Sequence, residues 1–221
     1  MESSSFAAVA VLVGTLVAAP ACAQATRQAK PETPAVALAT SGLAGQPIAV
    51  MPLTFVQSDR RIPGGTGPSA RALTLRQADS LLGDLLLERA PESTWILPPD
   101  LRRTAQRAGG IMPSPDKMGQ AVMRASGLKD LPDPLRTYVR QMVALIGGGR
   151  FAFIPAALYI SPGQADSLIV QLSAVVADGR SGRVVYRTLA VGRGATFTEA
   201  YFGALDTILP SDAPPPPPPA P

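Results

Sequence analysis

The sequence predicts a single α/β domain in which helices pack on a mixed sheet of about four to five strands. Residues 47–97 run as an apolar strand, a long amphipathic helix and a second short apolar strand, which is a βαβ start. A helical insert follows. From residue 151 the apolar residues change from helical to alternating spacing, which predicts a C-terminal β-meander and then a closing helix. Because βαβ units make parallel pairs and meanders make antiparallel pairs, the sheet must contain both.

The βαβ start has recognisable boundaries. The first strand is expected over residues 47–55, where Pro52 favours an edge position or a bend. A loop rich in glycine and proline follows. Thr74 and Gln77 then form a capping box that predicts the start of the helix, and Pro91 ends it. The apolar face of this helix is predicted to contain Leu75, Ala78, Leu82 and Leu85.

The insert is expected to contain three short helices, between a strand at 95–97 and Gly147. Each predicted start has a Ser or Asp residue, whose side chain can accept a hydrogen bond from a free N–H group of the first turn. Proline at the first helical position supports two of these starts. The expected caps are Asp100, Ser114 before Pro115, and Asp133 before Pro134, with Gly147 ending the third helix.

The C-terminal part predicts three strands and a helix. Strands are expected at 151–160, 168–177 and 183–191, and the last two form a hairpin because the turn-forming sequence DGRSG joins them. The closing helix is expected to begin at Thr196, which forms a second capping box with Glu199.

Both ends of the chain are expected to lie outside the domain. Residues 1–23 are predicted to be a signal peptide, since the apolar run at 6–19 has the length of a signal core and is too short to span ~30 Å of hydrocarbon. Residues 24–46 are expected to form a flexible linker, residues 47–210 the domain, and residues 211–221 a disordered polyproline tail.

The leader leaves two exported forms open. Small residues permit signal cleavage after Ala23 or after Ala25, which gives a soluble periplasmic or secreted protein. Cys22 is also a candidate lipidation site, which gives an outer-membrane lipoprotein. Membrane contact is expected only if Cys22 is lipidated or the leader is retained.

Composition excludes most familiar catalytic sites. The chain has no histidine, and its one cysteine is Cys22. A Ser-His-Asp triad, a Cys-His dyad and a His-ligated zinc site are therefore excluded. The net charge is +4, but basic residues gather only in pairs and 5% of residues are aromatic, so no nucleic-acid binding is expected. No catalytic residue, cofactor or metal is expected; a hydrolase that uses two carboxylates is the enzymatic alternative.

Three stretches carry a family resemblance. The sequence IAVMPL at 48–53 is similar to a VAVLPF-type opening strand, GRFAFI at 149–154 to a GADYVV-type strand, and residues 175–186 to a D-x-x-T-G-x-V hairpin. Together they resemble the group that includes the TolB amino-terminal domain, the curli-secretion lipoprotein CsgG and the penicillin-binding-protein activator LpoB. The resemblance implies a sheet with packed helices that contacts envelope proteins and has no catalytic activity. Neither a TolB-type propeller nor CsgG-type pore strands are expected here.

The loop after the first strand is the candidate contact site. It lies between a strand and a helix, where phosphate-binding loops occur, but no Gly-Lys-Ser/Thr sequence closes it. Long loops on a rigid scaffold also contact partners. We therefore predict a non-catalytic exported accessory protein that binds another envelope protein; the alternative is a periplasmic domain that binds a small ligand or anion at this loop. The candidate contact residues are Arg60, Arg61, Gly64, Gly65 and Gly67.

Overall fold

The computed structural model describes residues 36–62 and 67–211. The predicted signal peptide with Cys22, Ala23 and Ala25, the loop residues Gly64 and Gly65, and the predicted tail from residue 212 lie outside the described residues. Within the described ranges, no helix is both long and apolar enough to cross a membrane.

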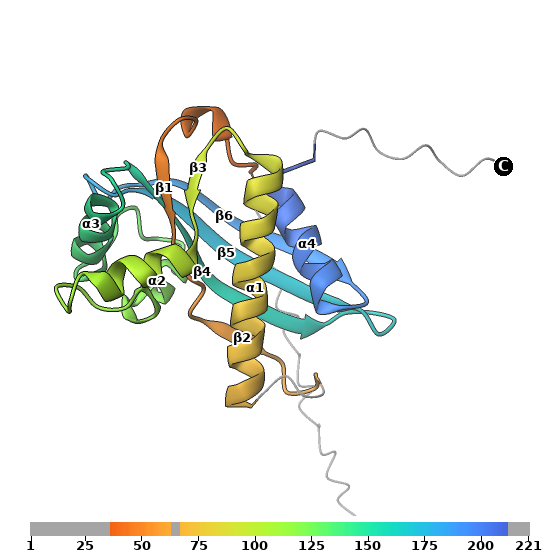
Figure 1. Ribbon diagram of the computed structural model, residues 1–221. Helices are drawn as coiled ribbons and strands as arrows, with labels where there is room; N and C mark the ends of the chain where they lie inside the picture. Colours follow the sequence, from red (N-terminus) through yellow and green to blue (C-terminus); the bar gives the residue numbers. More distant parts are fainter. Residues whose placement is uncertain (1–35, 63–66, 212–221) are drawn as a thin grey trace, which may run out of the picture. The chain divides into compact units, whose positions relative to one another are not determined.

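A six-stranded mixed sheet forms the centre of the domain (Figure 1). The strand order is β3-β1-β4-β5-β6, and β2 pairs with β4 beyond the end of β1. The pairs made by β1 and β2 are parallel, whereas β4–β5 and β5–β6 are antiparallel, as the βαβ start and the meander predict. The strands are β1 (Pro47–Val50), β2 (Val56–Ser58), β3 (Thr94–Ile96), β4 (Phe151–Pro162), β5 (Leu168–Asp178) and β6 (Val184–Gly194).

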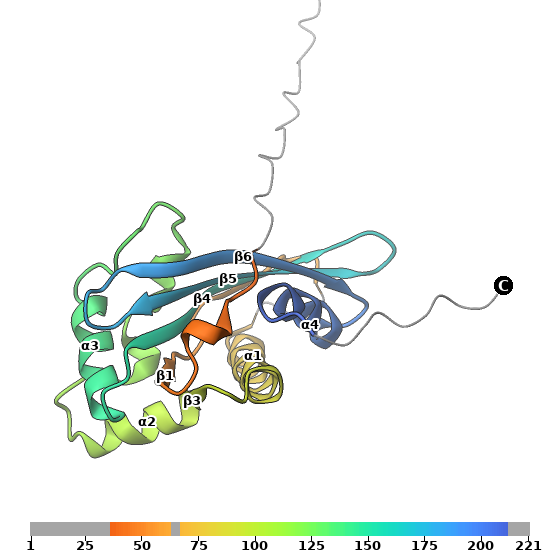
Figure 2. The ribbon, with the colours of Figure 1, turned by 90° about the horizontal axis from the view of Figure 1, so that it is seen from above.

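Helices cover both faces of this sheet (Figures 1 and 2). Alternation along the strands creates two cores: Phe153 and Val176 enter the core under α1 and α4, while Ala152 and Val175 enter the core under α2 and α3. The helices are α1 (Pro68–Arg89), α2 (Pro98–Arg107), α3 (Leu135–Leu145) and α4 (Phe197–Ile208), with 3-10 turns η1 (Thr40–Gly42), η2 (Pro115–Lys117) and η3 (Gln120–Arg124).

The strand predicted at 47–55 is two strands. β1 ends at Val50 and β2 begins at Val56, and Pro52 lies in the break because it has no N–H group for a ladder hydrogen bond. The predicted bend is therefore confirmed. The alternative edge position is wrong, since β1 lies between β3 and β4.

The first helix begins earlier than predicted. α1 starts at Pro68 with Gly67 as its N-cap, so the predicted start at Thr74 is wrong. Proline suits the first helical position because its φ is fixed and it has no N–H to satisfy. Thr74 lies inside the helix, where its hydroxyl donates to the Ala70 carbonyl at 2.9 Å. The helix therefore follows the glycine-rich loop directly.

Two other predicted caps are wrong. The N-cap of α2 is Leu97, and Pro98 takes the first helical position, which moves Asp100 into the first turn. The N-cap of α3 is Pro134, and the Asp133 carboxylate instead accepts a hydrogen bond from the Thr137 hydroxyl at 3.2 Å. At α2 a proline at the first helical position, rather than an acceptor side chain, sets where the helix starts.

The remaining predicted helix boundaries are confirmed. The Ser114 and Thr196 hydroxyls accept hydrogen bonds from the backbone N–H groups of Asp116 and Glu199. Gly147 follows α3 with φ +98°, a conformation that favours glycine at a helix end.

The folded unit begins before residue 47. The sequence placed residues 24–46 in a flexible linker, but residues 36–46 pack on the domain. Leu38 and Leu43 are buried in the core with α1 and α4, and the Leu38 N–H donates to the Ile208 carbonyl at 2.8 Å. Two leucines in an Ala- and Pro-rich stretch have no periodicity, which is why the sequence did not reveal this contact.

Candidate protein-contact surface

The two edges of the sheet differ greatly in length. The β3 edge is a strand of 3 residues, whereas the β6 edge has 11. An edge strand presents unpaired backbone N–H and C=O groups, and a long one is a template for another strand. At its first residue β6 is closed, because the Val184 N–H donates to the Lys129 carbonyl at 2.8 Å. A partner strand would therefore pair with the part of β6 that follows Val184.

Exposed apolar side chains gather beside β6. Within the described ranges, eight large hydrophobic residues are exposed, and four of them lie here: Val36 (62% exposed), Val122 (40%), Val185 (55%) and Leu189 (45%). Val36 adjoins β6 on the face that carries α4, because its carbonyl accepts from the Tyr186 hydroxyl. Val122 adjoins β6 on the opposite face, because it precedes Met123, whose carbonyl accepts from Arg187, so these residues flank the β6 edge from both sides. We call these four residues the β6 surface. Clustered exposed apolar side chains mark protein-contact sites more often than scattered ones do.

Arg187 makes this surface rigid and keeps its own charge away from the edge. Its guanidinium donates to the carbonyls of Met123 and Leu128, which ties β6 to the insert. Burial lowers the pKa of Arg187 from its usual value, although the group stays charged at neutral pH. The Arg187 guanidinium is therefore committed to the insert.

Aromatic side chains continue the sheet face of Leu189 towards β2. Leu189 of β6 lies opposite Ser173 of β5. Gln171, two residues before Ser173 and therefore on the same face, lies opposite Tyr159 of β4. The Tyr159 ring packs edge-on against Phe55, with ring centroids 5.8 Å apart. The Arg124 guanidinium lies 5.0 Å above the Phe55 ring. Aromatic residues and arginine are enriched in protein interfaces.

A buried ion network lies at the break between β1 and β2. Asp79 of α1 accepts hydrogen bonds from the Leu53 N–H at 2.8 Å and from Arg102 at 3.0 Å. Arg102 of α2 also makes a two-pronged contact with Asp116. Burial raises the pKa of Asp79 to about 6, against the lowering effects of the Leu53 N–H and Arg102, while Arg102 lowers the pKa of Asp116.

This network is structural. Both carboxylate oxygens of Asp79 are engaged, and the side chain is 7% exposed. Gln120 supports the same break by donating to the carbonyls of Pro52 and Pro115. The pKa of Asp79 is raised and that of Asp116 is lowered, as in the two carboxylates of a hydrolase. Here, however, both carboxylates bind the same guanidinium, that of Arg102. Across the described ranges, no three His, Cys, Asp or Glu side chains form a group able to hold a metal.

Sequence reasoning missed Asp79, although a signal was present. Asp79 is followed by Leu82 and Leu86 at helical spacing, so it lies on the apolar face of the predicted helix. A carboxylate on such a face needs a partner. The identity of that partner, Arg102, depends on how α2 packs.

The loop predicted as the contact site is only partly assembled for anion binding. Arg61 pairs with Asp59 at 2.9 Å, and hydrogen bonds from the Arg61 side chain and N–H lower the pKa of Asp59 to about 2. Asp59 thus neutralises Arg61. Arg60 is exposed and Gly67 caps α1, so among the described residues of this loop Arg60 is the one cation without an acidic partner.

Comparisons with known proteins found structural matches of low score. No family model matches the sequence, and no curated protein matches it. The solved structure of E. coli LpoB matches with a TM-score of 0.35 and 14% identity, covering 88% of each chain. The LpoB C-terminal domain of Salmonella enterica matches at 0.34 and 14%, over 67% of this chain and 82% of that one. PelC of Paraburkholderia phytofirmans, described as a dodecamer, matches at 0.36 and 12%, over 80% and 95%.

LpoB is one of the proteins of the group that the sequence motifs resemble. Lipoprotein GNA1162 of Neisseria meningitidis matches similarly, with a TM-score of 0.34 and 14% identity over 68% of this chain and 82% of that one. At these scores and identities the likeness carries no inference about partner or activity.

Proposed function

We propose that this protein is an exported accessory domain that binds another protein of the cell envelope and has no catalytic activity. The observation that carries the proposal is the β6 surface, where a long edge strand coincides with half of the exposed large hydrophobic residues of the described chain. An enzyme would need a site with free catalytic groups, and the best-placed buried carboxylate, Asp79, is fully engaged in hydrogen bonds.

Strand addition is the recognition mode that this geometry favours. A strand from the partner would hydrogen-bond to the free edge of β6, and apolar side chains on it would cover Val185 and Leu189. Burying an apolar side chain of this size contributes about 1.5–3 kcal/mol. Association costs about 4 kcal/mol or more, so the backbone hydrogen bonds and the remaining contact area must add to these two side chains. The aromatic pair Phe55 and Tyr159 continues the contact area across the sheet.

Export is supported by the apolar leader alone. Intact mass of the protein purified from an envelope fraction tests it. A mass that corresponds to cleavage after Ala23 or Ala25 is expected for a soluble periplasmic or secreted form, and an added diacyl group on Cys22 for a lipoprotein. An unprocessed chain recovered from the cytosol would contradict export.

Site-directed photocrosslinking in cells tests partner binding. A photoreactive residue at Leu189 or Val185 is expected to crosslink one and the same envelope protein. The matched control is Leu87, which is 51% exposed but lies on α1. Adding Leu189→Lys to the Val185 probe should abolish the product, because the lysine charge would be desolvated against an apolar partner surface. Equal products from Leu87, or none from β6, would show that this edge is not the contact surface.

A further inference from the structure

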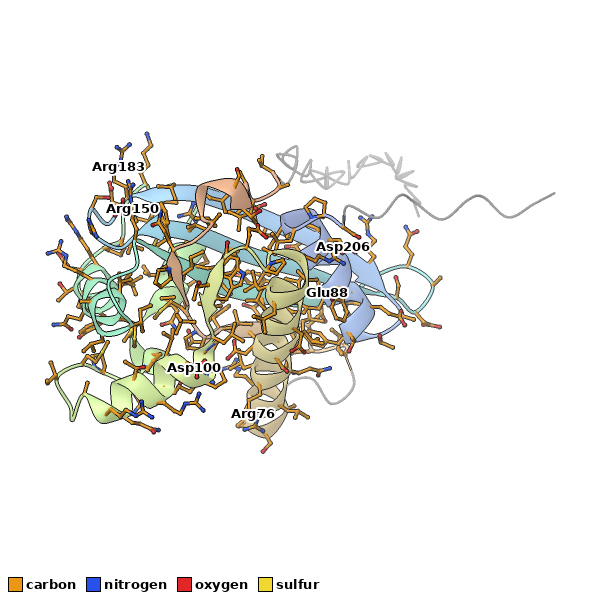
Figure 3. The ribbon with its side chains drawn as sticks, turned by 45° about the horizontal axis from the view of Figure 1, so that its top comes forward. Arg76, Glu88, Asp100, Arg150, Arg183 and Asp206 are labelled. Carbon is orange, nitrogen blue, oxygen red and sulfur yellow. The ribbon has the colours of Figure 1, made fainter. Side chains whose placement is uncertain are left out.

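The end of the sheet where β5 turns into β6 is strongly basic. Six cationic residues meet there from three segments of the chain, and Figure 3 shows Arg150 and Arg183 near each other at this end. We call this group the basic end. It consists of Lys129, Arg136 and Arg140 of α3, Arg150, Arg180 and Arg183.

Backbone contacts hold these segments together. The Leu131 N–H donates to the Gly182 carbonyl at 2.8 Å, and the Val184 N–H donates to the Lys129 carbonyl at 2.8 Å. The Gly179 N–H donates to the Arg150 carbonyl at 2.7 Å. These bonds clamp the turn between the strand ends and the segment before α3. A partner can therefore bind here without ordering a flexible loop, which lowers the entropic cost of association.

α3 adds its arginines to the same turn. Arg140 donates to the Arg180 carbonyl at 3.3 Å. Arg136 lies against Gly182, where an added β-carbon would be 2.8 Å from its Nε. Gly182 has φ +82°, so glycine both permits the turn and leaves room for the arginine.

Nearby acids neutralise only part of the basic end. Asp178 accepts hydrogen bonds from the N–H groups of Arg180 and Ser181 and from Arg150, and its side chain is 8% exposed. Asp133 accepts from the Thr137 hydroxyl. With Asp130, three acids face six cations. The side chains of Lys129, Arg180 and Arg183 are exposed and have no ionic partner among the described residues.

We propose that the basic end binds an acidic segment of the protein that docks on β6. This inference rests on the proposed function and names the chemistry of the partner. The free edge of β6 stops at Val184, where Lys129 closes it, so a strand added to β6 runs directly into Lys129 and Arg183. Carboxylates at that end of the partner strand meet arginine forks, which bind carboxylates in bidentate geometry.

A protein partner fits this end better than a lipid surface does. Membrane-surface sites often anchor through exposed aromatic side chains beside their cations. At the basic end the aromatic residues Tyr138 and Phe151 are partly buried, and the Arg150 guanidinium lies over the Phe151 ring, 5.1 Å from its centroid.

The probe is a short fluorescein-labelled oligoglutamate peptide, titrated with the purified exported chain at low and high salt. Arg180→Glu with Arg183→Glu is expected to weaken binding about tenfold, and added salt should weaken wild-type binding as well. The matched control is Arg71→Glu with Arg76→Glu, which makes the same charge change on α1; Figure 3 shows Arg76 far from Arg150 and Arg183. This control should retain affinity within about twofold. Circular dichroism confirms that both variants fold.

Three results would overturn the inference. They are no binding by the wild type, equal losses in both double variants, and preferential binding to phosphatidylglycerol vesicles over the peptide. The two proposals fail separately. If the chain binds the peptide but a probe at Leu189 gives no crosslink, the β6 contact is refuted. If the chain does not bind the peptide but crosslinking survives Arg180→Glu with Arg183→Glu, only the acidic partner is refuted.

Discussion

Replacing the buried carboxylate of Asp79 should change how stability depends on pH. Burial raises the pKa of Asp79 to about 6, from 3.8 in an exposed aspartate. Between these two pH values the unfolded chain has released this proton while the folded chain still holds it. Stability therefore falls as pH rises from about 4 to about 6. At about 1.4 kcal/mol per pKa unit, the loss amounts to about 3 kcal/mol.

Asp79→Asn removes the titration and keeps most of the geometry. The amide oxygen can still accept the Leu53 N–H, and Arg102 retains Asp116. The difference in unfolding free energy between the variant and the wild type should shift by about 3 kcal/mol in favour of the variant between about pH 3.5 and about pH 7.5. Urea unfolding at a series of pH values, followed by circular dichroism, measures this difference.

Asp84→Asn is the control, because Asp84 is exposed on the same helix and the substitution also removes one carboxylate. A constant difference between Asp79→Asn and the wild type across this pH range would show that burial does not govern Asp79. A shift in the opposite direction would mean that the ion pair with Arg102 outweighs burial.

Three further changes test the packing. Tyr201→Phe should stabilise the protein by about 1 kcal/mol in thermal or urea unfolding, because the Tyr201 hydroxyl is buried without a hydrogen-bond partner among the described residues; a clear loss of stability would imply a partner. Gly192→Ala should cost about 3 kcal/mol, since a β-carbon there would overlap the Ala200 carbonyl oxygen of α4, and Gly203→Ala, which meets only ordinary contacts, is its control. Burial raises the pKa of Asp178, but the Ser181 N–H, Arg150 and the Arg180 N–H together lower it to about 2. The wild type therefore gains about 2 kcal/mol of stability as pH rises from about 2 to about 4, and Asp178→Asn should remove this gain. If the wild type and Asp178→Asn unfold at the same pH in an acid titration, the lowered pKa of Asp178 is contradicted.

The sequence predicted well whatever depends on neighbours along the chain. The alternation at Leu168, Val170 and Leu172, joined to a glycine turn, predicted the hairpin of β5 and β6. The caps at Ser114 and Thr196 were predicted because a cap involves residues only two or three positions apart. Competing local signals caused the errors: prolines at positions 68 and 98 fix φ for a helix start, and they displaced the starts predicted at Thr74 and Asp100.

By itself, the sequence determined the βαβ-insert-meander order and, through the absence of histidine, the chemistries that this chain lacks. Tertiary structure alone decided that β6 is the long free edge, that Asp79 meets Arg102, and that Lys129, Arg140 and Arg180 come together at one end. The physical reason is distance along the chain. A strand's place in a sheet and the partner of a buried charge depend on residues tens of positions away, whose approach is set by the packing of two cores on opposite faces of one sheet.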